Sequence, residues 1–157
     1  MNTASGSREV IGDGIDFLQE RHGSFPVNQT TLSLSPDAYA DAVSRAEDGF
    51  ADVYVRVHND DGDVLHVEHD GRPRVPRCVG NSAKPLVERA CNAVHESTGV
   101  DCEIDEIVRV TIAGVRNADD PDAETVYRLL VLLDAVYDSG SLQNGVWQAD
   151  PKIPEFV

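Results

Sequence analysis

The chain has 157 residues, of which 41% are hydrophobic, and this is enough apolar material for one globular domain of ordinary size. It carries 28 acidic side chains against 13 basic ones, which gives a formal net charge of −15. A protein with this charge repels a phosphate backbone, so we expect no sequence-independent binding to nucleic acid.

The acidic residues are 18 Asp and 10 Glu, and the basic residues are 11 Arg and only 2 Lys. An acidic surface nearly free of lysine resembles that of proteins from salt-accumulating halophiles, and an ordinary acidic bacterial protein is the alternative. The 3 cysteines show no CxxC spacing, which predicts a reduced chain without a disulfide framework or a zinc clip. No apolar run is long enough to span a bilayer and no signal peptide is recognisable, so we expect a cytoplasmic protein without membrane contact.

Residues 1–50 are expected to form an N-terminal extension with a disordered start and short helices. Residues 9–22 could form one such helix, although two glycines weaken it. A short strand is expected at 30–33. Ser35 has the features of a helix N-cap, with Pro36 at the first helical position of a helix that ends near residue 47.

The hydrophobic period changes to two at Ala51, which predicts strands. Residues 51–57 and 64–68 are expected to form a hairpin around a turn rich in Asp. Further strands are expected at 103–115 and 124–137. The second of these contains the nearly continuous apolar run 127–133, which predicts a place at the centre of the sheet.

The strongest helical pattern runs from about Ala83 to Thr98, with Ser82 as a cap and Gly99 at the end. The expected buried positions are Leu86, Val87, Ala90, Cys91 and Val94, and the expected exposed stripe is Glu88, Asn92 and Glu96. Strands around one such helix predict an α+β domain.

This helix belongs to the most informative segment, Asp70 to Glu103, which reads DGRPRVPRCVGNSAKPLVERACNAVHESTGVDCE. It resembles the Nudix box, whose pattern is G-x5-E-x7-R-E-U-x-E-E-x-G-U with U a bulky aliphatic residue. Laid on this chain without gaps, the defined positions are occupied by Cys78, Lys84, Asn92, Ala93, Val94, Glu96, Ser97, Gly99 and Val100. The positions that agree with the pattern are Val94, Glu96, Gly99 and Val100.

Other positions extend this resemblance beyond the box. Asp70-Gly-Arg72 followed by Pro76 is similar to the DGRW-x-LPGG lead-in of many Nudix proteins. Leu133-Asp-Ala135 followed by Gly140 is similar to a strand and glycine turn downstream of the box. The resemblance implies a Nudix-type α/β/α sandwich with a mixed β-sheet over residues 51–157.

The resemblance also implies hydrolysis of a diphosphate linkage by water, with Mg2+ or Mn2+ held by glutamates of the box helix. Glu96 is the one helix glutamate of the pattern that remains, because Ala93 and Ser97 occupy the other positions. Glu96 is therefore the candidate catalytic residue and metal ligand, and Glu88 on the same stripe is a second candidate ligand. We expect turnover to be absent or much reduced, and no cofactor unless activity remains.

Basic residues gather where the Nudix fold leads into its diphosphate site. Arg72, Arg74 and Arg77 fall within six residues of a chain that has 13 bases. Guanidinium groups there could replace metal as the anion clamp, and Lys84 at a former glutamate position fits the same exchange. Surface salt bridges between these arginines and neighbouring acids are the alternative.

The first function hypothesis is a Nudix-like protein that binds a nucleotide or another diphosphate-containing small molecule, with little or no turnover. One alternative is an active Mg2+- or Mn2+-dependent pyrophosphohydrolase that uses Glu96 and an acid outside the usual positions. Another is a protein-interaction module that docks a partner through the apolar helix at 38–46 or the C-terminal Phe-Val. A homodimer is compatible with all three, because many Nudix domains dimerise.

Overall fold

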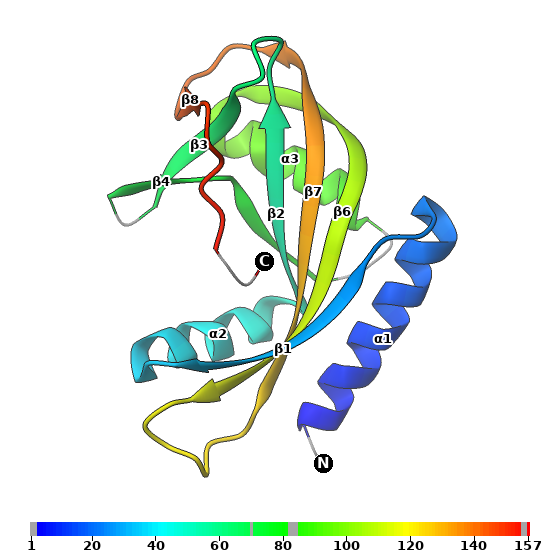
Figure 1. Ribbon diagram of the computed structural model, residues 1–157, viewed down its shortest axis with the longest axis vertical. Coiled ribbons are helices and arrows are strands. Elements are labelled where there is room, and N and C mark those ends of the chain that lie inside the picture. The colour runs from blue at the N-terminus through cyan, green and yellow to red at the C-terminus, as the bar shows by residue number, and fades with distance from the viewer. Residues whose placement is uncertain (1–2, 70, 82–84, 155–156) are drawn as a thin grey trace.

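The computed structural model describes residues 3–69, 71–81, 85–154 and 157. Over these residues, three helices pack on one mixed β-sheet, so the predicted α+β class is confirmed (Figure 1). No helix in these ranges is both long enough and apolar enough to cross a membrane.

The elements follow in chain order as α1 (Thr3–His22), β1 (Val27–Leu34), α2 (Pro36–Asp48), β2 (Ala51–His58), β3 (Val64–His69), β4 (Arg72–Arg74), β5 (Arg77–Gly80), α3 (Leu86–Thr98), β6 (Val100–Asn117), β7 (Val126–Gly140) and β8 (Val146–Gln148). The two strands expected after the box helix are confirmed as β6 and β7, although β6 starts earlier and β7 ends later than predicted. The helix expected at 83–98 is confirmed as α3. It begins at Leu86 with Pro85 at the cap position, and the expected cap Ser82 lies outside the described residues.

The strands run side by side in the order β1-β6-β7-β2-β3-β4, while β5 pairs with β2 and β8 pairs with β3. β1 is parallel to β6 and β2 is parallel to β7, and the remaining pairs are antiparallel. The apolar run 127–133 lies in β7, between β6 and β2, and most of it is buried. Its predicted place at the centre of the sheet is confirmed.

Different elements cover the two faces of the sheet (Figure 1). α1 and α3 cover one face, where Leu18 and Leu86 belong to a common core. α2 and the C-terminal segment cover the other face, where Ala42, Tyr54 and Val157 belong to a second core. We call these the α3 face and the α2 face. The sheet therefore lies between helical layers, as the expected sandwich requires.

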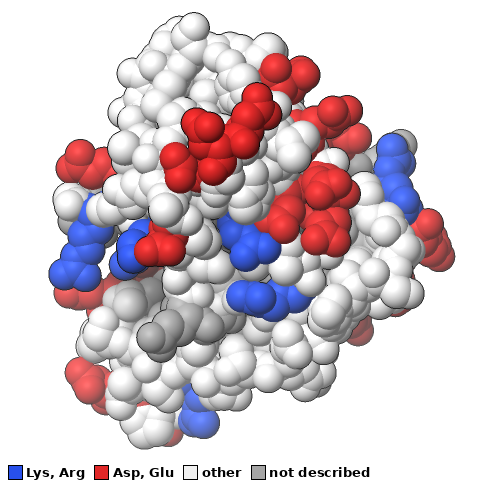
Figure 2. All heavy atoms as spheres, turned by 45° about the horizontal axis from the view of Figure 1, so that its top comes forward, with Lys and Arg blue, Asp and Glu red and all other residues white. Residues whose placement is uncertain are grey.

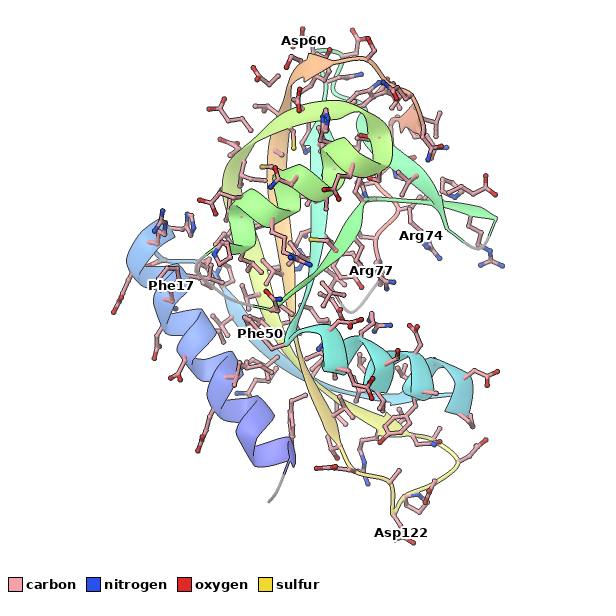
Figure 3. The ribbon with its side chains drawn as sticks, turned by 180° about the vertical axis from the view of Figure 1, so that it is seen from behind. Phe17, Phe50, Asp60, Arg74, Arg77 and Asp122 are labelled. Carbon is pink, nitrogen blue, oxygen red and sulfur yellow. The ribbon has the colours of Figure 1, made fainter. Side chains whose placement is uncertain are left out.

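The N-terminal helix contains two glycines, which weaken a helix. One of them, Gly14, is buried against the ring of Phe50, and a Cβ at Gly14 would lie 2.9 Å from Cε2 of that ring. Figure 3 shows Phe50 beside α1. Gly14 thus allows α1 to pack closely on the segment between α2 and β2.

Residues 27–48 contribute β1 and α2 to the sheet and its second core. α2 begins as predicted, with Pro36 in its first turn and with the Ser35 hydroxyl oxygen accepting a hydrogen bond from the Ala38 N–H at 3.3 Å. The division of the chain into an extension and a domain near residue 50 stays a prediction.

A buried ion pair joins β2, β7 and α2. Nη2 of Arg128 donates to Oδ1 of Asp52 at 2.8 Å, and both side chains are only 1% exposed. Arg45 of α2 donates through Nε to the same Asp52 oxygen at 3.2 Å, and Arg128 also donates to the Gly49 carbonyl. These hydrogen bonds compensate charges that would otherwise be costly to bury.

Candidate functional site

The residues that agree with the Nudix pattern include three with structural roles at the end of α3. Val94 and Val100 are fully buried in the core of the α3 face. Gly99 ends α3 with a φ of 85°, and a Cβ there would lie 2.6 Å from the Ser141 carbonyl oxygen. The structure therefore gives these three positions a role in folding.

Glu88 and Glu96 lie on the exposed stripe of α3, as their spacing predicted. Two turns of helix separate them by about 12 Å along the axis, which is too far for both carboxylates to bind one ion. Among the described side chains, no group of three or more His, Cys, Asp or Glu is arranged to hold a metal. The structure does not bring the two predicted ligands together, and metal binding at Glu96 stays a prediction.

Glu96 borders a hollow of about 440 Å3 at the end of α3, which Gln143 and Asn144 close on the other side. Beside it, Nδ1 of His95 lies 2.8 Å from Oδ1 of Asp101. Glu96 is the one carboxylate among the described residues that line this hollow. The hollow therefore offers a single charged oxygen ligand to a hard cation.

A different cavity brings two of the predicted arginines together. Arg74 of β4 and Arg77 of β5 line a pocket of about 170 Å3, and Figure 3 shows these two labelled residues near each other. The other described lining residues are Tyr54, Val67, Glu68, Val75, Lys152 and Pro154. We call it the cationic pocket, because three basic side chains and one acidic side chain line it.

The remaining predicted cations have other positions. Arg72 is exposed in β4 and is not among the residues that line the cationic pocket. Lys84 lies outside the described residues. Lys152, which the sequence analysis did not identify, lines the pocket instead. No sequence motif contains Lys152. It lies near Arg77 because the C-terminal segment crosses the α2 face of the sheet.

Backbone hydrogen bonds fix the chain at Lys152. Its N–H donates to Nε2 of the buried His66 at 2.9 Å, and its carbonyl accepts from the Val75 N–H at 3.2 Å. Nδ1 of His66 lies 2.9 Å from the Val64 carbonyl and donates to it. Because Nε2 accepts and Nδ1 donates, His66 is neutral here and serves to hold the C-terminal segment.

Tyr54 forms the buried wall of the cationic pocket. Its side chain is 5% exposed, and burial raises the pKa of its phenol, with Asp52 adding to the rise. Arg77 donates a hydrogen bond to the phenol oxygen and acts in the opposite direction. Tyr54 therefore stays protonated at neutral pH and helps to orient the Arg77 guanidinium.

The cationic pocket is a local exception in an acidic protein. Among the ion pairs of the described residues, none engages Arg74, Arg77 or Lys152. Figure 2 shows basic side chains toward the middle of the face in view, with acidic side chains around them. Among the described residues, therefore, no salt bridge with a neighbouring acid accounts for these three basic side chains.

The arginines and Glu96 do not form one site. Tyr54 and Val75, which line the cationic pocket, belong to the core of the α2 face. Glu96 lies on α3, whose buried side chains pack on the opposite face of the sheet. The sheet therefore separates the predicted anion clamp from the one remaining helix glutamate of the box.

Another cavity, of about 680 Å3, lies between α1 and strands β1, β6 and β7. Arg116 is the one charged side chain among its described lining residues, and several threonines surround it. None of the described residues that the sequence predicted as a site lines this cavity. It has the size of a small-molecule site but only one cation for an anionic ligand.

The sequence matches no protein-family model and no curated protein. The fold is similar in part to a UDP-X diphosphatase, with a TM-score of 0.46 and 15% identity over 75% of this chain and 58% of that chain. It is also similar in part to a proposed oxidoreductase from Sinorhizobium meliloti 1021, with a TM-score of 0.45 and 19% identity over 71% of this chain and 35% of that chain. This chain thus spans less than two thirds of either protein, and at this level neither activity transfers to it.

Proposed function

We propose that this protein is a Nudix-like protein that binds a nucleoside diphosphate-linked compound, and that Nudix catalysis in it is lost or much reduced. The observation that carries the proposal is the convergence of Arg74, Arg77 and Lys152 beside the Tyr54 phenol. Guanidinium and ammonium groups bind phosphate oxygens through charge-assisted hydrogen bonds. In this proposal the basic side chains neutralise the diphosphate, a role that Mg2+ or Mn2+ has in the family.

The size of the cationic pocket limits what it can enclose. Its volume of about 170 Å3 is below the roughly 300–1,000 Å3 of pockets that surround a whole drug-sized ligand. The pocket therefore suits the diphosphate group, while the nucleoside lies on the protein surface. We expect affinity to depend on the number of phosphates and only weakly on the base.

The loss of catalysis is supported by the chemistry of the pocket. Hydrolysis in the family requires carboxylates that hold a metal ion and sharpen the attacking water. Glu68 is the one carboxylate among the described residues that line the cationic pocket, and Glu96 is on the other side of the sheet. A bound diphosphate would therefore lack the acidic groups that the reaction needs.

Calorimetric titration with ADP-ribose in EDTA tests the proposal. We expect saturable binding in 0.2 M KCl, weakened by at least about tenfold in the Arg74→Gln/Arg77→Gln double variant, because charge-assisted hydrogen bonds to phosphate are lost. Arg72→Gln/Arg21→Gln is the matched control, because it removes the same two charges from exposed positions outside the pocket. If both variants bind ADP-ribose equally weakly, the ligand is attracted to the general surface charge, and the assignment to the pocket is refuted.

An active hydrolase is the second candidate, and the open hollow beside Glu96 favours it. Release of phosphate products from ADP-ribose would then require Mg2+ or Mn2+ and would be abolished by Glu96→Gln. Glu88→Gln is the matched control, because Glu88 lies on the same stripe but does not line the hollow. Turnover that survives in Glu96→Gln would exclude this candidate.

A further inference from the structure

A cavity of about 270 Å3 lies where the β2–β3 turn, the end of β7 and β8 meet. Its described lining residues are Asn59, Asp60, Asp61, Val100, Tyr137, Gly140, Leu142 and Trp147. They share no member with the lining of the cationic pocket. We call this cavity of about 270 Å3 the aromatic cavity. Figure 3 shows that Asp60, one of its lining residues, and Asp122 lie at opposite ends of the molecule.

Two aromatic rings meet almost at a right angle in the aromatic cavity. The ring centroids of Tyr137 and Trp147 are 6.1 Å apart, and their planes form an angle of 84°. A small group seated in the corner between two such rings contacts a π face of each. Because π faces carry partial negative charge, this corner attracts cations.

Both rings are held in place by the surrounding fold. The Tyr137 hydroxyl donates to the Gly140 carbonyl at 2.6 Å, and this hydrogen bond fixes the polar end of the ring. Trp147 belongs to β8, where it is opposite Leu65 of β3, and its ring packs against the core of the α3 face. A ligand in the corner would therefore order little that is not already ordered.

Asp60 and Asp61 add negative charge to the rim of the same cavity. Both are exposed, and none of the ion pairs among the described residues engages either of them. The described lining contains no Lys, Arg or His. The described lining thus combines two aromatic rings and two carboxylates and contains no basic side chain.

We propose that the aromatic cavity binds the quaternary ammonium group of a small organic cation. Such a group carries a positive charge but has no N–H to donate, so π faces and carboxylates attract it through charge and not through hydrogen bonds. The small volume suits a compact head group. The site is independent of the proposed diphosphate function, because the two cavities share no described residue.

Titration with choline tests the proposal through the fluorescence of Trp147, which is the single tryptophan of the chain. The matched ligand is 3,3-dimethylbutan-1-ol, which has the shape of choline without its charge. We expect a saturable change with choline and binding of the alcohol that is weaker by at least about fivefold, because cation–π attraction requires the charge.

Variants of the rings and the acids locate the site. Tyr137→Leu should weaken choline binding by at least about fivefold, whereas Tyr137→Phe keeps the ring and should bind nearly as the unaltered chain does. Asp60→Asn/Asp61→Asn should weaken binding in 0.1 M KCl and less in 2 M KCl, where charges are screened. Asp119→Asn/Asp122→Asn is the matched control, since it removes the same charge from the β6–β7 loop.

Equal affinities for choline and the alcohol would overturn the proposal, because they would indicate an apolar hollow. It would also be overturned by unchanged choline binding in Tyr137→Leu, or by no saturable signal up to about 100 mM choline. Thermal unfolding of each variant separates loss of fold from loss of binding. If Tyr137→Leu does not fold, the choline and alcohol comparison on the unaltered chain still decides the outcome.

Discussion

Asp52 and Arg128 are the charged side chains of the described chain that are almost fully removed from water, each with 1% exposure. Removing one partner of a buried pair leaves the other charge without compensation, which costs more than the pair itself contributes. The pair also connects two parallel strands to α2 through Arg45. The pair therefore adds a polar connection between α2 and the sheet to the apolar packing of Ala42.

Asp52→Ala is expected to lower the free energy of unfolding by about 3–5 kcal/mol, because Arg128 is left buried and unpaired. Asp41→Ala is the control, since the exposed Asp41–Arg45 pair contributes about 1 kcal/mol or less. Denaturant unfolding in molar KCl, followed by circular dichroism, measures both values. Similar losses in the two variants would show that burial of the pair has no special cost.

The glycine that ends α3 offers a second comparison at the residue scale. Gly99 and Gly62 have nearly the same φ, 85° and 82°, but only at Gly99 would a Cβ meet other atoms within 4 Å. Gly62→Ala should therefore cost only the left-handed backbone strain of about 1–2 kcal/mol. Gly99→Ala should cost clearly more in the same unfolding experiment, and equal costs would contradict the close approach to Ser141.

At the scale of elements, α3 and β6 bring two cysteine thiols together. A hydrogen bond from the Cys102 thiol lowers the pKa of Cys91 to about 7, and the same contact together with burial raises the pKa of Cys102. Burial raises the pKa of the Cys78 thiol to about 11. Cys91 is thus the cysteine that carries a thiolate near neutral pH.

Alkylation by iodoacetamide should therefore modify Cys91 first, at a rate that rises with pH and has its midpoint near 7. In Cys102→Ala the hydrogen bond to the thiolate is gone, so the midpoint should move up toward the ordinary value near 9. Peptide mass spectrometry identifies the modified cysteine. An unchanged midpoint in Cys102→Ala would rule out the thiol contact as the cause.

The sequence predicts those elements whose signal is local. The exposed stripe of α3, the turn at Gly99 and the cap at Ser35 follow from residues within a few positions of one another. Of the predicted buried stripe of α3, Leu86, Ala90 and Val94 are buried, whereas Val87 and Cys91 are half-buried. Arg77 and Lys152 in the cationic pocket are about 75 positions apart in the chain, and so are Asp52 and Arg128. The alternation of apolar residues predicts that Asp52 lies on a strand, but it does not predict which charged residue of another strand pairs with Asp52.

At the scale of the whole molecule, the net charge of −15 acts on folding as well as on partners. Like charges repel one another in the compact state, and salt screens this repulsion. The melting temperature should therefore rise by at least about 5 °C between 0.1 M and 1 M KCl. At a pH near the isoelectric point of about 4.5 the rise should shrink, because the net charge is then small. A salt effect that is independent of pH would argue against charge repulsion.

The parallel pairing of β1 with β6 sets a limit on how the chain can fold during synthesis. Val27 lies beside Val110 and Ala51 beside Leu129, so the first strands made find these partners only after most of the chain has left the ribosome. Contacts of such long sequence separation slow folding and expose unpaired strand edges meanwhile. We expect a nascent chain stopped near residue 98 to lack these pairings, so that β2 pairs with β3 and β5 while β1 still waits for β6.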